Sequence, residues 1–338
     1  MNMTENTADK LTHVVGIGAS AGGLMALEEF FKTVPSHTGI AYVVIQHLPA
    51  DHKSMMLELL SRHTELEVCY IEDNMPLKSD CIYLIPPGFN VKLFHSRFLL
   101  SQSKHDNRQL NLPIDIFFSS LAEDQEEKAI AIILSGTGSD GSRGIRHIKE
   151  NFGITIVQDL NTAQFDGMPK SAVQTGIIDF ILPPEKMIHH ILAYIQHPFA
   201  AKSTAQPKIL ADETGLTRIF SLLREHHLVD FTFYKQATVL RRIERRMTIN
   251  QMHELADYIK YLESYPKEIS TLYNELLIGV TSFFRDPDAF DFLKEKVLPQ
   301  IFASKAGSEI RFWVEGCSTG EEAYSLGVLC REVMEGNN

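Results

Sequence analysis

The sequence has few features of a secreted, membrane or metal-binding protein. Its 338 residues include four cysteines, Cys69, Cys81, Cys317 and Cys330, and no pair has C-x-x-C spacing. This pattern indicates reduced thiols and predicts neither a disulfide framework nor a metal site. No apolar run reaches the roughly 18 residues that predict a membrane span. Residues 1–11 are polar, lack the apolar core of a signal peptide and are interpreted as a loose tail.

The chain also lacks an excess of positive charge and the usual nucleotide-binding motifs. Its formal net charge is −11, which argues against general nucleic-acid binding. Gly16, Gly18 and Gly22 resemble a dinucleotide loop only loosely, and the acidic residue expected near the end of the next strand is replaced by Gln46-His47. No G-K-[ST] motif is present. A nucleotide-dependent oxidoreductase is therefore disfavoured, and a cytoplasmic protein without membrane insertion is expected.

Residues 12–197 alternate short apolar runs with amphipathic stretches. The runs are rich in β-branched residues and end in turns, and they read THVVGIG, IAYVVIQH, CIYLIPP, AIAIILSG, ITIVQD and GIIDFILP. Helical patterns such as LMALEEFFKTV and PIDIFFSSLAED lie between them. This alternation predicts an α/β domain with a doubly wound parallel sheet and helices on both faces.

The pattern changes after this domain. Residues 198–215 mix Pro, Ala, Ser and Thr and are interpreted as a linker, and residues 216–304 have helical periodicity throughout. Residues 305–338 read as one strand, a glycine turn and one helix. We expect an all-α subdomain followed by the first βα unit of an incomplete Rossmann-like domain.

Three polar residues follow predicted strands: Ser20, His47 and Asp140. The carboxyl ends of parallel strands meet at one edge of a sheet, so these side chains are expected to converge. A hydroxyl nucleophile, an imidazole base and an orienting carboxylate are the groups that acyl transfer needs. A helix opening after Ser20, at Ala21 and Gly22, would supply N–H donors for an oxyanion.

The motifs GASAGG, QHLP, YLIPPG, LPIDIFFSSLA, SGTGSDG and DGMPKSA resemble, in order and spacing, the catalytic domain of the chemotaxis protein-glutamate methylesterases. The resemblance implies that Ser20 is the nucleophile, His47 the general base and Asp140 the orienting acid, with Thr137 and Gly138 beside the oxyanion site. The implied substrate is the γ-glutamyl methyl ester on chemoreceptor helices, with glutamine deamidation as a second reaction and no cofactor.

The sequence departs from this family at two places. Thr137 stands where enteric members have methionine, and the eleven residues before the domain are too few for the phospho-receiver domain that usually precedes it. Control of the esterase by its own phosphorylation is therefore not expected.

The segment TVLRRIERRMTI gathers Arg241, Arg242, Arg245 and Arg246 on about one and a half turns of a predicted helix. A solvated helix face is the usual explanation of such a run. Because the chain is acidic overall, a docking face for an acidic partner is the alternative.

YKQATVLRRIERRM, TSFFRD and GCSTGEE together resemble the chemotaxis glutamate O-methyltransferases. The resemblance implies that Thr281, Arg285 and Glu322 contact S-adenosylmethionine and that the arginine helix docks on the receptor. Gly279 stands where classical members have asparagine.

Both halves together resemble fused methylesterase–methyltransferase proteins. Because only one strand of the cofactor domain is seen before Asn338, we expect a truncated domain that binds S-adenosylmethionine weakly and does not methylate. The leading hypothesis is a serine esterase for methylated glutamates. The alternative is a non-catalytic signalling scaffold that retains both folds for receptor binding.

Overall fold

A computed structural model describes residues 11–46, 55–103, 111–197, 213–279, 283–305, 308–318 and 320–336. The chain divides into two compact units, residues 1–277 and 278–338. The predicted tail falls outside the described residues except for Leu11, and so does the predicted linker up to residue 212. No helix among the described residues is long and apolar enough to span a membrane.

The first unit is built on a seven-stranded parallel sheet with the order β3-β4-β2-β1-β7-β8-β9. Its strands are β1 His13–Ala19, β2 Ile40–Gln46, β3 Glu67–Tyr70, β4 Cys81–Leu84, β7 Ala129–Ile133, β8 Ile154–Gln158 and β9 Phe180–Leu182. The central strands β1 and β7 are buried on both faces, which explains their continuous apolar runs. The predicted doubly wound α/β fold is confirmed.

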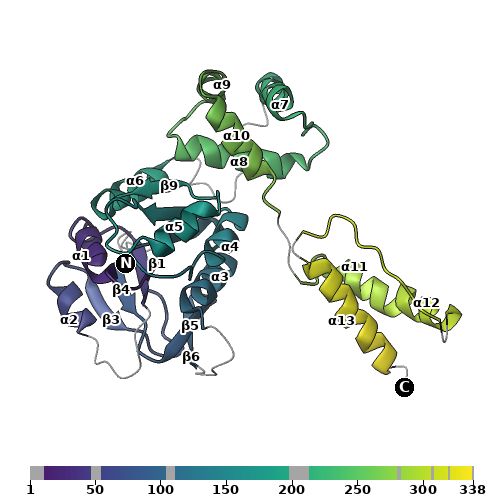
Figure 1. Ribbon diagram of the computed structural model, residues 1–338, viewed down its shortest axis with the longest axis horizontal. Coiled ribbons are helices and arrows are strands. Elements are labelled where there is room, and N and C mark those ends of the chain that lie inside the picture. The colour runs from purple at the N-terminus through teal and green to yellow at the C-terminus, as the bar shows by residue number, and fades with distance from the viewer. Residues whose placement is uncertain are drawn as a thin grey trace, which may run out of the picture. The chain divides into compact units, whose positions relative to one another are not determined.

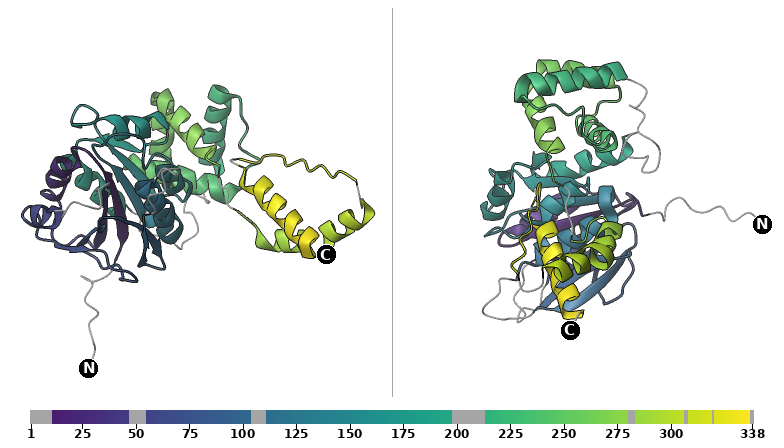
Figure 2. Two further views of the ribbon diagram at one scale, coloured as in Figure 1. Left: turned by 60° about the horizontal axis from the view of Figure 1, so that its bottom comes forward. Right: turned by 90° about the vertical axis from the view of Figure 1, so that its right-hand side faces the viewer.

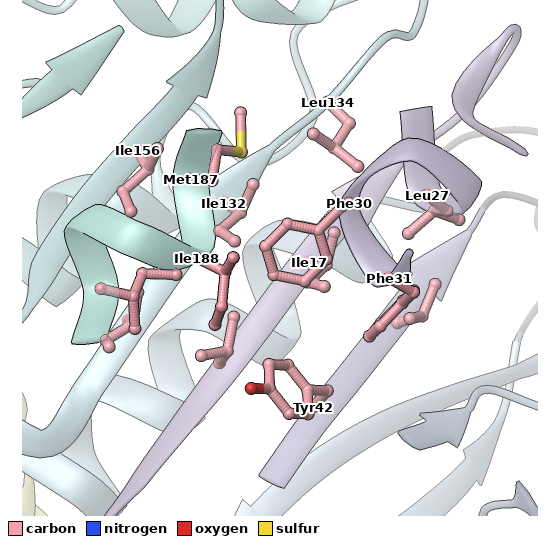
Figure 3. Close-up of a cluster of buried hydrophobic side chains, with 14 of the residues drawn as sticks. Ile17, Leu27, Phe30, Phe31, Tyr42, Ile132, Leu134, Ile156, Met187 and Ile188 are labelled. Atoms are coloured by element: carbon pink, nitrogen blue, oxygen red, sulfur yellow. The ribbon is translucent and has the colours of Figure 1, made fainter. Parts of the chain in front are cut away.

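Helices cover both faces of this sheet (Figure 1). The first face packs against α1 Gly23–Phe31, α2 Met56–Ser61 and α6 Pro184–Gln196. Figure 3 shows the centre of that layer, where Phe30 and Phe31 of α1 meet Ile17 and Tyr42 of the sheet. The second face packs against α3 Pro113–Gln125, α4 Gly144–Glu150 and α5 Gly167–Gln174. A short 3-10 turn, η2 Glu126–Lys128, connects α3 to β7.

Two strand features were missed by the sequence analysis. The first is the short edge strand β3, and the second is an antiparallel hairpin of β5 Phe89–Phe94 and β6 Arg97–Gln102. Val91, Leu93 and Phe98 of the hairpin are buried in the cluster beneath α3. Alternation of buried and exposed residues along β5 was the available signal.

The first unit also contains four helices after the sheet: α7 Glu213–His227, α8 Gln236–Ile249, α9 Leu255–Ser264 and α10 Pro266–Leu276 (Figure 2). They share a separate core that includes Leu223, Phe231, Ile243, Tyr258 and Leu272. The predicted all-α region is therefore present.

The second unit consists of α11 Pro287–Phe292, the π-helical turn η4 Leu293–Val297, α12 Leu298–Ser304 and α13 Glu321–Gly336. Phe290, Leu298, Leu329 and Val333 form its small core. The helix of the expected strand–turn–helix unit forms as α13, whereas residues 309–314 are in no strand. The described residues of this unit contain no strand with which residues 309–314 could pair, and an unpaired strand would leave its backbone groups unsatisfied.

Candidate functional site

The predicted site lies at the point where the order of the strands in the sheet reverses. The chain proceeds from β1 to β2 on one side, and later returns to β7 on the other side of β1. Ser20 directly follows β1, and Asp140 lies in the loop after β7. Ligands of open α/β sheets bind at such switch points, at the carboxyl ends of the strands. The topology thus brings two of the three predicted catalytic residues to one edge.

Backbone hydrogen bonds fix the turn at Ser20. Its N–H donates to the Ser135 carbonyl at 3.0 Å, and its own carbonyl accepts from Gly23 N–H at 2.9 Å. Gly22 precedes α1 with φ of 71°, a left-handed conformation that glycine adopts without steric cost. The serine is half-buried, so its side chain stands at the surface of a rigid turn.

Ser135 was missed by the sequence analysis, although it connects three parts of the site. It is 1% exposed. Its hydroxyl donates to the Ala21 carbonyl at 2.9 Å and accepts from Phe165 N–H at 3.0 Å, and its N–H donates to Gln158 Oε1 at 2.8 Å. The signal was a small polar residue directly after a buried strand, inside the SGTGSDG motif.

The loop after β7 runs close against the serine turn. A Cβ atom added to Gly136 would lie 2.9 Å from Ser20 Cβ and 2.3 Å from Met168 Sδ. Gly136 also bonds residues 165 and 168 through its N–H and its carbonyl. The GASAGG, SGTGSDG and DGMPKSA motifs therefore meet at one place.

The Asp140 carboxylate is anchored on the first turn of α3. It is 7% exposed and accepts hydrogen bonds from the backbone N–H groups of Ile114 at 3.1 Å and Asp115 at 3.0 Å. Because these donors belong to a helix N-terminus, they stabilise a negative charge. The carboxylate is thus held in a single orientation.

Asp115 makes the reciprocal contact and was also missed by the sequence analysis. Its Oδ1 accepts from the N–H groups of Arg143 at 3.0 Å and Gly144 at 2.7 Å, where α4 begins. Burial raises the pKa of Asp115, and the donors from Gly144 and Arg143 oppose that rise. Asp140 therefore caps α3 while Asp115 caps α4. An aspartate in the first turn after Pro113 was the available sequence signal.

The remaining esterase residues are placed in part. His47 comes directly after β2 in the sequence but lies outside the described residues. Thr137 and Gly138 are exposed, whereas Ala21 and Gly22 are half-buried. The Ala21 carbonyl accepts from the Ser135 hydroxyl, so the direction of the following Gly22 N–H is fixed by the trans peptide plane. The oxyanion role of these four residues stays a prediction.

The arginine helix does not present the broad exposed basic face that the sequence suggested. It is α8, and only Arg241 is exposed, where it pairs with Glu127 at 2.8 Å. Arg242, Arg245 and Arg246 are 1%, 5% and 5% exposed. They contact carbonyls and carboxylates of the first unit, because the arginine side of α8 faces the sheet domain and α10. Receptor docking by these residues stays a prediction.

In the second unit, two predicted cofactor residues are described. Arg285 and Glu322 are both exposed, and Thr281 lies outside the described residues. The N–H of Phe284 donates to Ser325 Oγ of α13 at 2.9 Å, and a Cβ atom on Gly279 would lie 2.7 Å from Ser318 Oγ. Phe284 therefore contacts α13, and Gly279 lies close to the turn before α13. A Cβ atom on Gly316 would contact nothing within 4 Å, so the turn is uncrowded at this position.

Comparison with known proteins gives three family matches along the chain. Residues 15–191 match the CheB methylesterase family, residues 214–277 the CheR methyltransferase all-alpha domain, and residues 279–338 the CheR methyltransferase SAM binding domain. The solved CheB methylesterase catalytic domain of Thermotoga maritima is similar, with a TM-score of 0.50 and 30% identity over 53% of this chain and 97% of that chain.

Two relatives match different extents of this chain. A putative protein-glutamate methylesterase/protein-glutamine glutaminase from Leptospira interrogans is 34% identical over 51% of this chain and 89% of its own length. A Rhodobacter capsulatus protein described as "Uncharacterized 104.1 kDa protein in hypE 3'region" is 41% identical over 83% of this chain, but the match covers only 32% of that protein. The chain thus spans about a third of the length of this relative, whose match crosses both halves. With the switch-point geometry above, these matches show that the chain belongs to the CheB methylesterase family and carries CheR methyltransferase all-alpha and SAM-binding domains after its methylesterase domain.

Proposed function

We propose that the first domain hydrolyses glutamate γ-methyl esters on chemoreceptor helices, with Ser20 as nucleophile, His47 as general base and Asp140 as orienting acid. The observation that carries this proposal is the placement of Ser20 and the anchored Asp140 at the ends of neighbouring strands. A carboxylate buried on a helix N-terminus is suited to hold an imidazole in one tautomer.

The mechanism follows the chemistry of these groups. Ser20 Oγ attacks the ester carbonyl while His47 accepts its proton, and a tetrahedral oxyanion forms. His47 then donates that proton to the departing methoxide, so methanol leaves and the acyl-enzyme remains. Water attacks the acyl-enzyme with His47 again as base, which releases glutamate and restores Ser20. Asp140 stabilises the imidazolium in both halves of the cycle.

The oxyanion is assigned to backbone N–H groups of the Ser20 turn and the loop after β7. Ala21 and Gly22 supply one side, and Thr137 and Gly138 supply the other. Gly138 has φ of 87°, and its carbonyl accepts from Ser171 Oγ at 3.1 Å, which supports a fixed loop geometry. Each donor of this kind contributes about 3 kcal/mol to transition-state stabilisation in characterised serine enzymes.

Methanol release from methylated receptor membranes tests the assignment. The unchanged chain should release methanol, and Ser20→Ala should lower the rate by at least about a thousandfold. Ser61→Ala, at an exposed position in the last turn of α2, is the matched control and should keep the full rate. Equal release by Ser20→Ala and the unchanged chain would refute the nucleophile. No release by either would favour the scaffold alternative.

For the second unit, we propose that Thr281, Arg285 and Glu322 hold S-adenosylmethionine, which supplies the methyl group in glutamate methylation. The hydrogen bond from Phe284 to Ser325 of α13, with the close approach of Gly279 to Ser318, supports this grouping. Because residues 309–314 are not paired in a sheet, the turn lacks the strand that would hold it, and weak binding is expected. Calorimetry with S-adenosylmethionine checks this, and a micromolar dissociation constant would contradict it.

A further inference from the structure

Helix α4 is held at both of its ends by groups from distant parts of the chain. Its first turn is capped by Asp115, and it begins only three residues after Gly141 in the Asp140 loop. Its last turn ends in a Schellman motif, since Gly153 N–H donates to the Ile148 carbonyl at 2.9 Å and Phe152 N–H donates to the Lys149 carbonyl at 3.2 Å. Phe152 therefore occupies, with φ of 67°, a position usually taken by glycine.

Two arginines of α8 bind this C-terminal end. Arg242 donates to the Lys149 carbonyl at 2.9 Å and the Glu150 carbonyl at 3.4 Å. Arg245 donates to the Phe152 carbonyl at 3.2 Å and the Gly153 carbonyl at 2.6 Å. The carbonyls of Lys149 and Glu150 carry the negative end of the helix dipole, so a guanidinium group is favourable there. The ring of Phe152 lies under Arg241 and Arg242, at 4.0 and 4.2 Å from their Cζ atoms.

Two buried carboxylates complete the contact, which we call the α4 clamp: Lys149, Asp179, Arg242, Arg245 and Glu275. Glu275 of α10 lies 2.6 Å from Arg245 and 2.9 Å from Lys149 Nζ. Asp179 pairs with Arg245 at 2.5 Å and also with Lys149. Its side chain is fully buried and that of Glu275 is 1% exposed. Every charge of the clamp therefore has a partner of opposite sign, as buried charges require.

We propose that the all-α domain positions the catalytic Asp140 of the methylesterase domain, because the α4 clamp fixes the helix that follows the Asp140 loop. This inference rests on the proposed esterase function. Ile145 N–H donates to the Gly141 carbonyl at 2.9 Å, and Gly144 N–H donates to Asp115, so α4 is continuous with the loop on one side and with the α3 cap on the other. Arg242, Arg245 and Glu275 are thus positioning residues.

Two glutamates on α10 provide a matched pair of variants. Glu275 binds Arg242, Arg245 and Lys149, whereas Glu268 binds Arg246, Tyr258 and Asn250 inside the all-α domain. Both carboxylates are buried and both pair with arginines of α8. Glu275→Gln should therefore open the clamp. Glu268→Gln should weaken the all-α domain while leaving the hydrogen bonds to α4 in place, because its partner Arg246 reaches the clamp at Asp179, 3.9 Å away, and not at α4. Arg245→Lys, which retains the charge but not the forked donors, is the milder second variant.

The readouts are methanol release over pH and hydrogen exchange of amides 141–150, all in the full chain. We expect Glu275→Gln and Arg245→Lys to lower kcat by about tenfold with little change in KM, to shift the acid limb of kcat to lower pH, and to speed exchange in α4. Glu268→Gln should do none of these. Equal effects of Glu268→Gln and Glu275→Gln, or no effect of either, would overturn the proposal.

If the unchanged chain releases no methanol, the proposed function fails. The hydrogen-exchange measurement alone then decides whether the all-α domain positions the Asp140 loop. Faster exchange at residues 141–150 in Glu275→Gln only would support the positioning link. Identical exchange in the two variants would reject it.

Discussion

Gly136 is the residue where a single methyl group should disturb the site most directly. An alanine Cβ there would lie 2.9 Å from Ser20 Cβ and 2.3 Å from Met168 Sδ. Met168 can yield only partly because it is 1% exposed in the core. We expect Gly136→Ala to move Ser20, to lower kcat at least about tenfold, and to reduce the free energy of unfolding by about 1–3 kcal/mol. Methanol release and denaturant unfolding measure these two effects.

Gly176→Ala is the control for this variant. Gly176 has φ of 71° and no atom within 4 Å of an added Cβ, so alanine there adds backbone strain without crowding. It should cost about 1 kcal/mol of stability and leave the esterase rate unchanged. A Gly136→Ala protein with full activity would show that Ser20 tolerates the contact.

The sequence predicted the candidate site residues that follow strands but not the residues that contact them. Ser20 and Asp140 were predictable because parallel topology collects the residues after strand ends at one edge. Ser135 and Asp115 act through hydrogen bonds to Phe165 and Gly144, which are about thirty residues away along the chain. No local pattern states which distant N–H group a buried hydroxyl or carboxylate will meet.

The reciprocal capping of α3 by Asp140 and of α4 by Asp115 should affect both the stability of the protein and its esterase rate. Asp115→Ala removes the two hydrogen bonds at the start of α4, so we expect a loss of about 1–2 kcal/mol of unfolding free energy. Because α4 continues from the Asp140 loop, kcat for methanol release should also fall. Chemical denaturation and esterase kinetics on the same protein check both expectations.

Asp124→Ala is the comparison for that variant. Asp124 is on the same helix and accepts from Ser96 N–H at 3.0 Å, but it lies at the end of α3 away from Asp140. It should lower stability without lowering kcat. A rate that falls equally in both variants would show that general weakening of α3, and not the cap exchange, controls activity.

The arginine helix shows where periodicity stops being informative. Helical periodicity predicted a helix in TVLRRIERRMTI, and α8 is that helix, with Val239, Leu240, Ile243 and Met247 buried. A solvated face was the usual explanation of its arginines. The sequence alone does not show that the carbonyls of residues 149–153 and buried carboxylates lie next to them in the folded protein. The sequence signal for buried arginine partners was the pair Glu268 and Glu275, which are seven residues apart and so lie on one side of α10.

The buried carboxylates of the α4 clamp, which join the sheet domain to the all-α domain, should make the stability of the first unit fall at acidic pH. Burial would raise the pKa of Glu275, but Arg245 and Lys149 overcome it and lower the pKa from 4.5 to about 2. Asp179 is likewise buried, and Arg245 and Lys149 hold its pKa below the ordinary value. A carboxylate with a depressed folded-state pKa contributes stability above its unfolded pKa and loses it as the pH falls through the folded one.

We therefore expect the unfolding free energy of the unchanged chain to fall more steeply than that of Glu275→Gln between pH 4.5 and about 2, by about 3 kcal/mol in total. Urea unfolding at several pH values measures the two curves. Parallel curves would mean that Glu275 titrates normally in the folded protein.

The exchange of caps also has a consequence for the order of folding. Asp140 follows β7 in the sequence, whereas α3, which it caps, precedes β7. Asp115 precedes β7, whereas α4, which it caps, follows β7. Neither α3 nor α4 can therefore have its native cap until β7 has formed and the two helices lie next to each other. We infer that α3, β7 and α4 assemble in a single cooperative event. The turn at Ser20, which bonds to Ser135 just after β7, therefore acquires its shape only after that event.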